Sequence, residues 1–314
     1  MKILITAGYH LSEDKLDLLR DLGCQPVLWP KEKEPVAEEH WDADILFSYQ
    51  VFNYTDVRRF HNLKLIQLTS SGIDHIPMEY LREKNIKLCN ARGIYSIPIA
   101  EWVLLKTMEI YRNSRFYEKA QEGKVWKKHR EMEEIYGKTV GIVGTGSIGT
   151  ETAKRFHSFG AKVVGINRDG RKIEAFHECH SIHHLAKVVG EWDILVLALP
   201  LTKDTEGLIN EAILAQMKKE ALLINVSRGP VIVEEALMDH LNRERLKGAA
   251  LDVFQEEPLP EESLWWSHPK VLVTPHVSFL STSVPERAFQ LAYRNIKAFK
   301  EGRPLENLQT SLFK

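Results

Sequence analysis

The sequence has 314 residues, of which 44% are hydrophobic and 27% charged, with 18 Gly and 13 Pro. This composition excludes collagen-like, low-complexity and largely disordered chains, and the length is sufficient for two domains. With 42 basic and 43 acidic residues the net charge is −1, so neither a nucleic acid nor an anionic membrane is expected as a partner, and a small molecule is the expected ligand.

The cysteines and the apolar runs indicate where in the cell the protein is expected to lie. Cys24, Cys89 and Cys179 lie far apart and form no Cys-x-x-Cys pair, which predicts a reducing, cytoplasmic location. The N-terminal apolar run is too short for an export signal. The longest apolar run, residues 194–201, is interrupted by Pro200 and is far shorter than the roughly 20 residues of a membrane-spanning helix.

Short β-rich apolar runs alternate with helical patterns in the first part of the chain, for example the leucine spacing of residues 12–22. Alternating strands and helices predict a parallel sheet of the α/β class. The expected strands are residues 3–7, 27–29, 45–49, 65–69 and 86–89.

A second series of apolar runs predicts a second doubly wound parallel sheet. Its expected strands are residues 139–143, 163–166, 194–199, 222–226, 249–253 and 271–274. Between the two series, residues 99–111 predict a long helix, which is followed by a charged excursion, residues 118–134, around Trp126.

A last helical pattern, residues 286–301, is too short to be a domain and is expected to pack on the first domain. The chain is therefore predicted to contain a flavodoxin-like substrate domain, residues 1–98 and 284–314. A Rossmann cofactor domain, residues 99–283, is predicted to be inserted into it.

A glycine-rich motif follows the first strand of the second series. It reads Gly144, Thr145, Gly146, Ser147, Ile148 and Gly149, and a helical pattern comes after it. Strand, Gly-x-Gly-x-x-Gly and helix in this order are typical of a dinucleotide-binding site. Gly144 allows the tight turn, Gly146 lets the backbone approach a pyrophosphate, and Gly149 lets helix and strand pack closely. A merely glycine-rich turn is the alternative, which the flanking elements disfavour.

The type of cofactor depends on the end of the next expected strand. An acidic residue for the ribose hydroxyls is usual there, about 20 residues after the motif, but this chain has Asn167, followed by Arg168 and Arg171. An amide beside two guanidinium groups suits a 2′-phosphate better than a free diol, which favours NADP(H) over NAD(H). Alternatively, both arginines are solvated loop residues and Asp169 binds the ribose.

Three further polar motifs follow expected strands, at the edge where doubly wound sheets bind ligands. They contain Arg228, Glu257 and His276. Such residues together can bind a carboxylate, tune an imidazole and transfer a proton, as the reduction of a 2-keto acid requires. Taken singly, each has a plain structural alternative: a surface charge, one of several acids in a loop, or a packed histidine after Pro275.

These motifs resemble those of the D-isomer-specific 2-hydroxyacid dehydrogenases over almost the whole chain. The segments that carry the resemblance are residues 70–75, 90–93, 99–101, 144–149, 199–202, 227–229, 252–258 and 274–276. The resemblance implies that Arg228 binds the substrate's carboxylate and keto oxygen, that His276 is the acid–base group, and that Glu257 hydrogen-bonds to it and charges it.

The resemblance also implies that the backbone amides of Ser71 and Gly72 hold the carboxylate and that Asp252 is a supporting acid. Besides the glycine motif and the loop at Asn167, the expected cofactor-binding residues are Leu199, Pro200, Thr205, Val226, Ser227 and Asp252. A homodimer is expected, because in the resembling family the excursion between helix and glycine motif reaches a partner subunit.

The predicted activity is hydride transfer between a nicotinamide cofactor and a small unphosphorylated 2-keto acid or D-2-hydroxy acid, such as glyoxylate, hydroxypyruvate or pyruvate. Phosphoglycerate enzymes of this family tend to carry arginines near the glycine turn at Gly72 and near the end of the third strand. This chain has Leu68 and the uncharged residues 48–51 there. After the histidine, the resembling family usually has a run of small residues that contains glycine. This chain has Val-Ser-Phe-Leu at residues 277–280 instead, which affects the expected size of the pocket near the substrate.

Two other functions use the same fold. A corepressor-like protein that senses NAD(H) and binds partner proteins is disfavoured by the intact arginine, glutamate and histidine. A formate-dehydrogenase-like enzyme expects an amide partner for the histidine, where this chain has Glu257. A further cluster resembles a metal site in composition alone and is expected to be an exposed polar loop without a metal, because the His-Glu-x-x-His spacing is missing. It contains His177, Glu178, Cys179, His180, His183 and His184.

Overall fold

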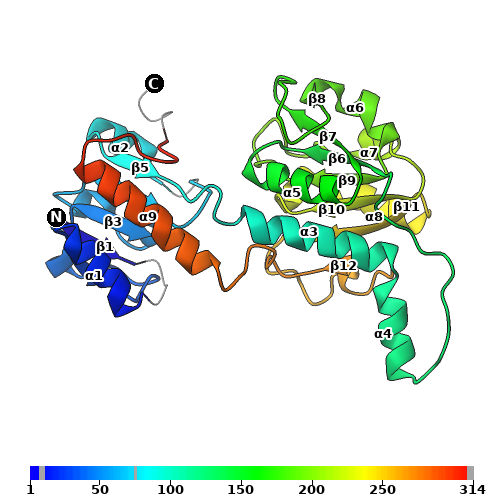
Figure 1. Ribbon diagram of the computed structural model, residues 1–314, viewed down its shortest axis with the longest axis horizontal. Coiled ribbons are helices and arrows are strands. Elements are labelled where there is room, and N and C mark those ends of the chain that lie inside the picture. The colour runs from blue at the N-terminus through cyan, green and yellow to red at the C-terminus, as the bar shows by residue number, and fades with distance from the viewer. Residues whose placement is uncertain (7–10, 74–75, 310–314) are drawn as a thin grey trace. The chain divides into compact units, whose positions relative to one another are not determined.

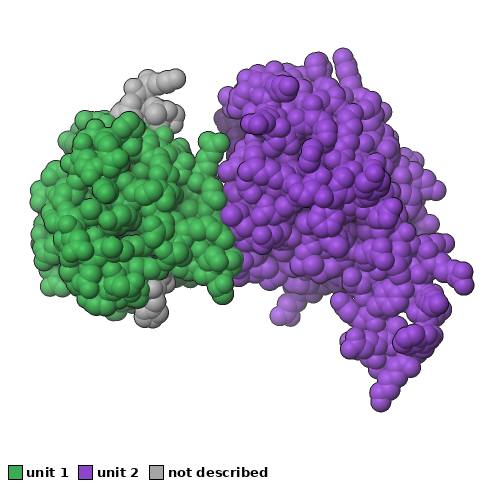
Figure 2. Space-filling view, in the orientation of Figure 1, with its two compact units in different colours: residues 1–94, 281–314 green, residues 95–280 purple. Residues whose placement is uncertain are grey.

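The computed structural model describes residues 1–6, 11–73 and 76–309. Ala7 of the first expected strand and Asp74 and His75 of the 70–75 motif lie outside the described residues. The chain divides into two compact units (Figure 2), and helices and strands carry the labels of Figure 1. Unit 1 is Met1–Ile94 with Ser281–Lys314, and unit 2 is Tyr95–Leu280.

Unit 1 contains a five-stranded parallel sheet with the order β2-β1-β3-β4-β5. The strands are β1 (Lys2–Ile5), β2 (Gln25–Leu28), β3 (Ile45–Ser48), β4 (Leu65–Leu68) and β5 (Lys87–Cys89). Each overlaps an expected strand, so the predicted parallel sheet is confirmed. The helices are α1 (Glu13–Asp21), α2 (Met78–Glu83) and α9 (Val284–Lys300), with short 3-10 helices η1 (Glu38–His40), η2 (Val51–Asn53) and η3 (Val57–Arg59).

Helix α9 packs on the sheet of unit 1, as its amphipathic pattern predicted. Pro285 lies in its first turn, where the missing N–H costs no helical hydrogen bond. The side chain of Asn295 is fully buried and donates a hydrogen bond to Gln67 Oε1 on β4, with an N···O distance of 2.6 Å. The last helix of the chain is thereby joined to the first sheet.

Unit 2 contains a seven-stranded parallel sheet with the order β12-β11-β10-β9-β6-β7-β8. The strands are β6 (Thr139–Val143), β7 (Lys162–Asn167), β8 (Glu178–Ser181), β9 (Ile194–Leu197), β10 (Ala221–Asn225), β11 (Leu246–Leu251) and β12 (Val271–Val273). The helices are α3 (Ser96–Tyr111), α4 (Ser114–Glu122), α5 (Ser147–Ser158), α6 (Leu185–Val188), α7 (Glu211–Leu214) and α8 (Glu234–Asn242), with short 3-10 helices η4 (Ile182–His184), η5 (Val189–Glu191), η6 (Gly229–Val231) and η7 (Leu264–Trp266).

Both faces of the sheet of unit 2 are buried, as parallel sheets require. On β9, Leu195 and Leu197 join one apolar cluster, whereas Ile194 and Val196 join another. Because successive side chains of a strand point to opposite faces, the two clusters lie on opposite sides of the sheet. Strands in such a layer read as continuous apolar runs, and this made them visible in the sequence.

The prediction of a loop for the histidine-rich cluster is wrong at residues 178–181, which form the edge strand β8 beside β7. This strand is half-buried and carries Glu178 and His180, so it has no apolar run to reveal it. Within the described ranges, no three His, Cys, Asp or Glu side chains are arranged to hold a metal ion. In the same ranges, no helix has the length and apolarity to cross a membrane.

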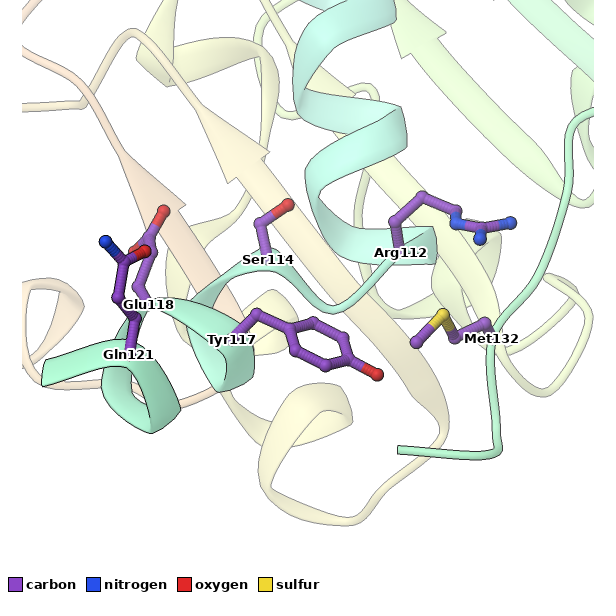
Figure 3. A pocket seen from close by; sticks show the side chains of 6 residues that line it. All are labelled: Arg112, Ser114, Tyr117, Glu118, Gln121 and Met132. Carbon is purple, nitrogen blue, oxygen red and sulfur yellow. The ribbon is translucent and has the colours of Figure 1, made fainter. Parts of the chain in front are cut away.

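The expected excursion begins with α4, which projects from the rest of unit 2 together with the segment that follows it (Figure 1). The backbone N–H of His129 donates to Tyr117 Oη, 3.1 Å away, and holds the returning segment on α4. Tyr117 and Met132 line a shallow pocket of about 390 Å³ between the two segments (Figure 3). Trp126, at the turn of the excursion, is 98% exposed.

Candidate active site

The carboxyl-terminal edge of the seven-stranded sheet carries most of the predicted site residues. His276 follows β12, Glu257 follows β11 and Arg228 follows β10. Residues 199–205 follow β9, the glycine motif follows β6, and Asn167 ends β7. Because neighbouring strands are parallel, their carboxyl ends meet at the same edge. The three polar loops are therefore neighbours, and the glycine motif lies further along the same edge.

His276 and Glu257 form a close pair. The distance from His276 Nδ1 to Glu257 Oε2 is 2.8 Å, and the two side chains are 39% and 36% exposed. In the part of the chain that the structure describes, His276 Nε2 has no hydrogen-bond partner. The carboxylate therefore orients the ring, and the free nitrogen is available to exchange a proton with a ligand.

The side chain of Asp252 stabilises the loop that contains His276. Its carboxylate is fully buried and accepts hydrogen bonds from Thr274 Oγ1 at 2.5 Å, from the Val277 N–H at 2.9 Å and from the Ser278 N–H at 3.0 Å. The loop needs this support because His276 has a φ of 51°, in the left-handed region that L residues seldom adopt. The sequence analysis included Thr274 in the motif 274–276 but gave it no role, because β12 separates it from Asp252 in the chain.

One residue of the run 277–280, which departs from the resembling family, packs against the histidine. The ring of Phe279 lies edge-on to the imidazole of His276, with 5.9 Å between centroids. The same ring contacts Tyr95, with 5.7 Å between centroids. Phe279 therefore occupies space beside the imidazole and limits its rotation.

Arg228 lies in the loop between β10 and η6, and its side chain is exposed. Its Nη1 donates to the Ser227 carbonyl at 2.6 Å, and no described residue accepts a hydrogen bond from its other guanidinium nitrogens. The next residue, Gly229, touches the loop after β11: a Cβ there would lie 1.9 Å from the Phe254 carbonyl carbon. This close approach ties the arginine loop to the loop of Glu257, whose Oε1 accepts from the Phe254 N–H at 3.0 Å.

The glycine motif has the shape that a dinucleotide requires. Gly144 has a φ of 104°, and a Cβ there would lie 2.4 Å from the Ala198 carbonyl oxygen. A Cβ at Gly149 would lie 1.9 Å from the Gly144 carbonyl oxygen, whereas a Cβ at Gly146 would meet no atom within 4 Å. The motif thus keeps open space above Gly146, at the first turn of α5, where a pyrophosphate can approach the backbone. The residues present fit a nicotinamide dinucleotide.

The other predicted cofactor residues lie on the neighbouring loops of this edge. Thr205 is buried, and its hydroxyl donates to the Pro200 carbonyl at 2.8 Å, which closes the loop after β9. Leu199, Val226 and Ser227 are also buried. These loops follow β9 and β10, and β9 is the direct neighbour of β6.

The side chain of Asn167 stabilises the loop after β7 through hydrogen bonds to the backbone of that loop. Asn167 Oδ1 accepts from the Gly170 N–H at 2.7 Å, and its Nδ2 donates to the Arg171 carbonyl at 2.9 Å. A hydrogen bond from the Arg171 N–H holds the pKa of the Asp169 carboxyl below its usual range, and the two side chains pair at 3.3 Å. The Arg168 guanidinium is exposed and has no partner among the described residues.

Ser71 and Gly72 belong to unit 1, where they follow β4. Within the described ranges, neither backbone N–H has a hydrogen-bond acceptor. Asn90, to which no sequence pattern assigned a role, donates from Nδ2 to the Ser71 carbonyl at 2.8 Å. A polar residue directly after β5, at the same edge of the sheet, is the signal that could have identified it.

Known proteins are similar to this chain over nearly its whole length. Residues 104–278 match the family model for the D-isomer specific 2-hydroxyacid dehydrogenase, NAD binding domain. A glyoxylate reductase of Thermofilum pendens is 33% identical over 305 residues, which cover 93% of this chain and 90% of the relative.

Solved structures agree with this similarity. A D-isomer specific 2-hydroxyacid dehydrogenase family protein from Aeromonas salmonicida has a TM-score of 0.81 at 28% identity, with 98% of each chain covered. An NADPH-dependent glyoxylate/hydroxypyruvate reductase from Sinorhizobium meliloti, in complex with NADP and sulfate, has a TM-score of 0.76 at 27% identity, covering 98% of this chain and 97% of that one.

Proposed function

The chain belongs to the D-isomer-specific 2-hydroxyacid dehydrogenase family of nicotinamide-dependent oxidoreductases, and we propose that it reduces a small unphosphorylated 2-keto acid, such as glyoxylate or hydroxypyruvate, with NADPH. The observation that carries this proposal is the pair of His276 and Glu257, 2.8 Å apart, on loops adjacent to that of Arg228. We assign cofactor binding to unit 2 and a substrate-binding role to Ser71 and Gly72 of unit 1.

The proposed reaction divides its tasks among these side chains. A bound nicotinamide dinucleotide supplies the hydride for the keto carbon. Arg228 holds the substrate's carboxylate and keto oxygen with charge-assisted hydrogen bonds and stabilises the negative charge that grows on that oxygen. Protonated His276 donates its Nε2 proton to the same oxygen, while Glu257 stabilises the imidazolium. In the reverse direction neutral His276 accepts the proton.

Two features support a small substrate without a phosphate. Phe279 takes up space beside the imidazole of His276. The segment after β3, Tyr49 to Val51, carries no positive charge, and Leu68 ends β4. A phosphate group would need a cation at such a position to offset its charge.

The direct test is a spectrophotometric assay of NADPH and NADH oxidation with glyoxylate, hydroxypyruvate, pyruvate and 3-phosphohydroxypyruvate. We expect turnover with the first three acids and at least about tenfold lower kcat/KM with the phosphorylated acid. Absence of turnover with every acid and both cofactors would contradict the proposal and favour an NAD(H)-sensing binding protein on this fold.

The preference for NADPH rests on the loop after β7. Asn167 has no charge to repel a 2′-phosphate, and the free guanidinium of Arg168 is available to bind it. The Asp169 carboxylate pairs with Arg171 and so weakens the second arginine as a phosphate ligand. Because this loop is exposed, solvent screening limits the preference.

We expect the double variant Asn167→Asp with Arg168→Ala to reverse the cofactor preference. The new carboxylate binds both ribose hydroxyls and repels the phosphate, and the main phosphate donor is lost. The measurement is kcat/KM for NADPH and for NADH in both proteins, with Lys172→Ala, which removes a nearby exposed charge, as the control. A wild type that already favours NADH refutes the preference and points to Asp169 as the ribose ligand.

We further propose that the protein is a homodimer whose interface includes the excursion. Trp126 is 98% exposed there, and Tyr136 on the returning segment is 74% exposed. Large apolar side chains on a projecting segment are typical of a protein interface.

Sedimentation velocity should give about twice the chain mass of 36.1 kDa for the wild type and for Trp266→Asp, a control at another partly exposed tryptophan. Trp126→Asp should shift the population towards the monomer, because an interface core excludes an unpaired carboxylate. A monomeric wild type rules out the dimer.

We also propose that the protein works in the reducing environment of the cytoplasm. Cys24, Cys89 and Cys179 are all unpaired. Burial raises the pKa of the Cys89 thiol to about 12, so this thiol stays protonated at neutral pH and reacts poorly. Unpaired cysteines are typical of proteins that work in a reducing compartment.

A further inference from the structure

Three successive carbonyl groups of the turn after β4 in unit 1, those of Ser70, Ser71 and Gly72, are occupied. The Ser70 carbonyl accepts from the Ala91 N–H at 2.8 Å, the Ser71 carbonyl from Asn90 Nδ2 at 2.8 Å, and the Gly72 carbonyl from the Ser70 hydroxyl at 2.8 Å. In contrast, the N–H groups of Ser71 and Gly72 have no acceptor in the described part of the chain. The backbone of these three residues therefore offers free donors but no free carbonyl.

The occupied carbonyls decide where the free donors point. In a planar trans peptide the C=O and the following N–H point in opposite directions. The hydrogen bond from Asn90 to the Ser71 carbonyl therefore aims the Gly72 N–H away from Asn90. The hydrogen bond from the Ala91 N–H to the Ser70 carbonyl likewise aims the Ser71 N–H away from Ala91.

We propose that Asn90 is a positioning residue for substrate binding: its side-chain amide turns the peptide between Ser71 and Gly72 so that the Gly72 N–H faces the substrate's carboxylate. This inference rests on the proposed function of the two backbone amides. It adds a residue that touches neither substrate nor cofactor and acts on affinity through the backbone.

The side chain of Asn90 can adopt only one orientation without losing bonds. It is 8% exposed. Its Oδ1 accepts from the Arg92 N–H at 3.2 Å, while its Nδ2 donates to the Ser71 carbonyl. Exchange of the two ends would set like groups against each other at both contacts. The amide is thus locked in the orientation that serves the turn.

The backbone of Asn90 is itself held by hydrogen bonds to Asn307 and Gln67. Its N–H donates to the Asn307 carbonyl at 3.4 Å, and its carbonyl accepts from Gln67 Nε2 at 3.5 Å. Gln67 Oε1 accepts from Asn295 on α9 at 2.6 Å. The C-terminal helix therefore supports Asn90 and, through it, the Gly72 amide.

The test is Asn90→Asp, which keeps an oxygen for the Arg92 N–H and replaces the donor to Ser71 with a second oxygen. We expect the KM for glyoxylate to rise about tenfold or more, with kcat and the KM for NADPH changed less than about twofold. Asn62→Asp is the matched control. It makes the same change at an exposed side chain of unit 1, whose Nδ2 donates to the Asp42 carbonyl at 3.3 Å. Within the described ranges this side chain has no hydrogen bond to the turn or to Asn90, so the KM for glyoxylate should stay at the wild-type value.

Binding of oxamate, a carboxylate that cannot turn over, separates this inference from the proposed function. It is measured by calorimetry in the presence of NADPH on wild type, Asn90→Asp and Asn90→Ser, with thermal melting to show which variants are folded. The wild type should bind oxamate, and each folded Asn90 variant should bind it about tenfold more weakly. Absence of keto-acid turnover in a wild type that binds oxamate refutes the reaction alone. A wild type that binds no oxamate, or a folded Asn90 variant with unchanged affinity and KM, overturns the role of Asn90. Failure of both Asn90 variants to fold also overturns it, because Asn90 is then structural.

Discussion

Replacing Arg228 with alanine is expected to lower kcat/KM for glyoxylate about a thousandfold, while the KM for NADPH changes less than about threefold. Two charge-assisted hydrogen bonds, to the substrate's carboxylate and to its keto oxygen, are lost at roughly 1.5–3 kcal/mol each. The folded state should be hardly affected, because the side chain is exposed and, among the described residues, it donates only to the neighbouring Ser227 carbonyl. Steady-state kinetics and thermal melting measure the two effects.

Arg228→Lys is the informative companion. Lysine keeps the positive charge but lacks the planar fork that grips two oxygens at once. We expect its kcat/KM to lie between those of the wild type and Arg228→Ala. If Arg228→Ala retained keto-acid reduction within about threefold of the wild type, the assignment of Arg228 would be wrong.

Replacing His276 with asparagine is expected to lower kcat by about 10²- to 10⁴-fold, because the developing alkoxide loses its proton donor. Asparagine is preferred to alanine in this test, since it tolerates the left-handed φ of 51° at this position. The loop should therefore keep its bonds to Asp252, and the melting temperature should stay close to that of the wild type. A folded variant with a kcat near the wild-type value excludes His276 as the acid.

The variant Glu257→Gln distinguishes the role of Glu257 from that of His276. In Glu257→Gln the new carbonyl can still accept from the Phe254 N–H, which leaves an uncharged NH₂ group facing His276 Nδ1. The proton-donating ring then loses its counter-charge and its acceptor at Nδ1, so kcat for glyoxylate should fall by about tenfold, less than in His276→Asn, where the proton donor itself is lost. Steady-state kinetics measure this effect, and a folded Glu257→Gln variant with an unchanged kcat shows that Glu257 is not the partner.

The strands and the glycine turn were predictable because their signals are local. Short apolar runs identified eleven of the strands in the described ranges, and the central ones among these are buried on both faces. The turn at Gly144 is specified by six consecutive residues, 144–149. β8 was missed because Glu178 and His180 place polar groups on a half-buried edge strand, where no apolar run is needed.

The nearness of Arg228, Glu257 and His276 could be predicted from the sequence, since each follows an expected strand and parallel strands end at one edge. Their proposed roles came from the family resemblance. Their geometry depended on contacts between segments distant in the chain. Asp252 supports the histidine loop through hydrogen bonds across 22 to 26 positions. No spacing rule describes such a contact, because the strands and helices between the partners decide whether they meet.

The sequence by itself therefore determined the fold class, the nucleotide turn and the placement of Arg228, Glu257 and His276 after neighbouring strands. Only the tertiary structure decided that the Asn167 side chain bonds within its own loop, that Arg171 pairs with Asp169 whereas Arg168 has no partner among the described residues, and that Asn90 donates to the turn at Gly72. The physical reason is that periodicity and turn chemistry are properties of neighbouring residues, whereas each hydrogen-bonding group takes the best partner that the packed chain brings within about 3 Å of it.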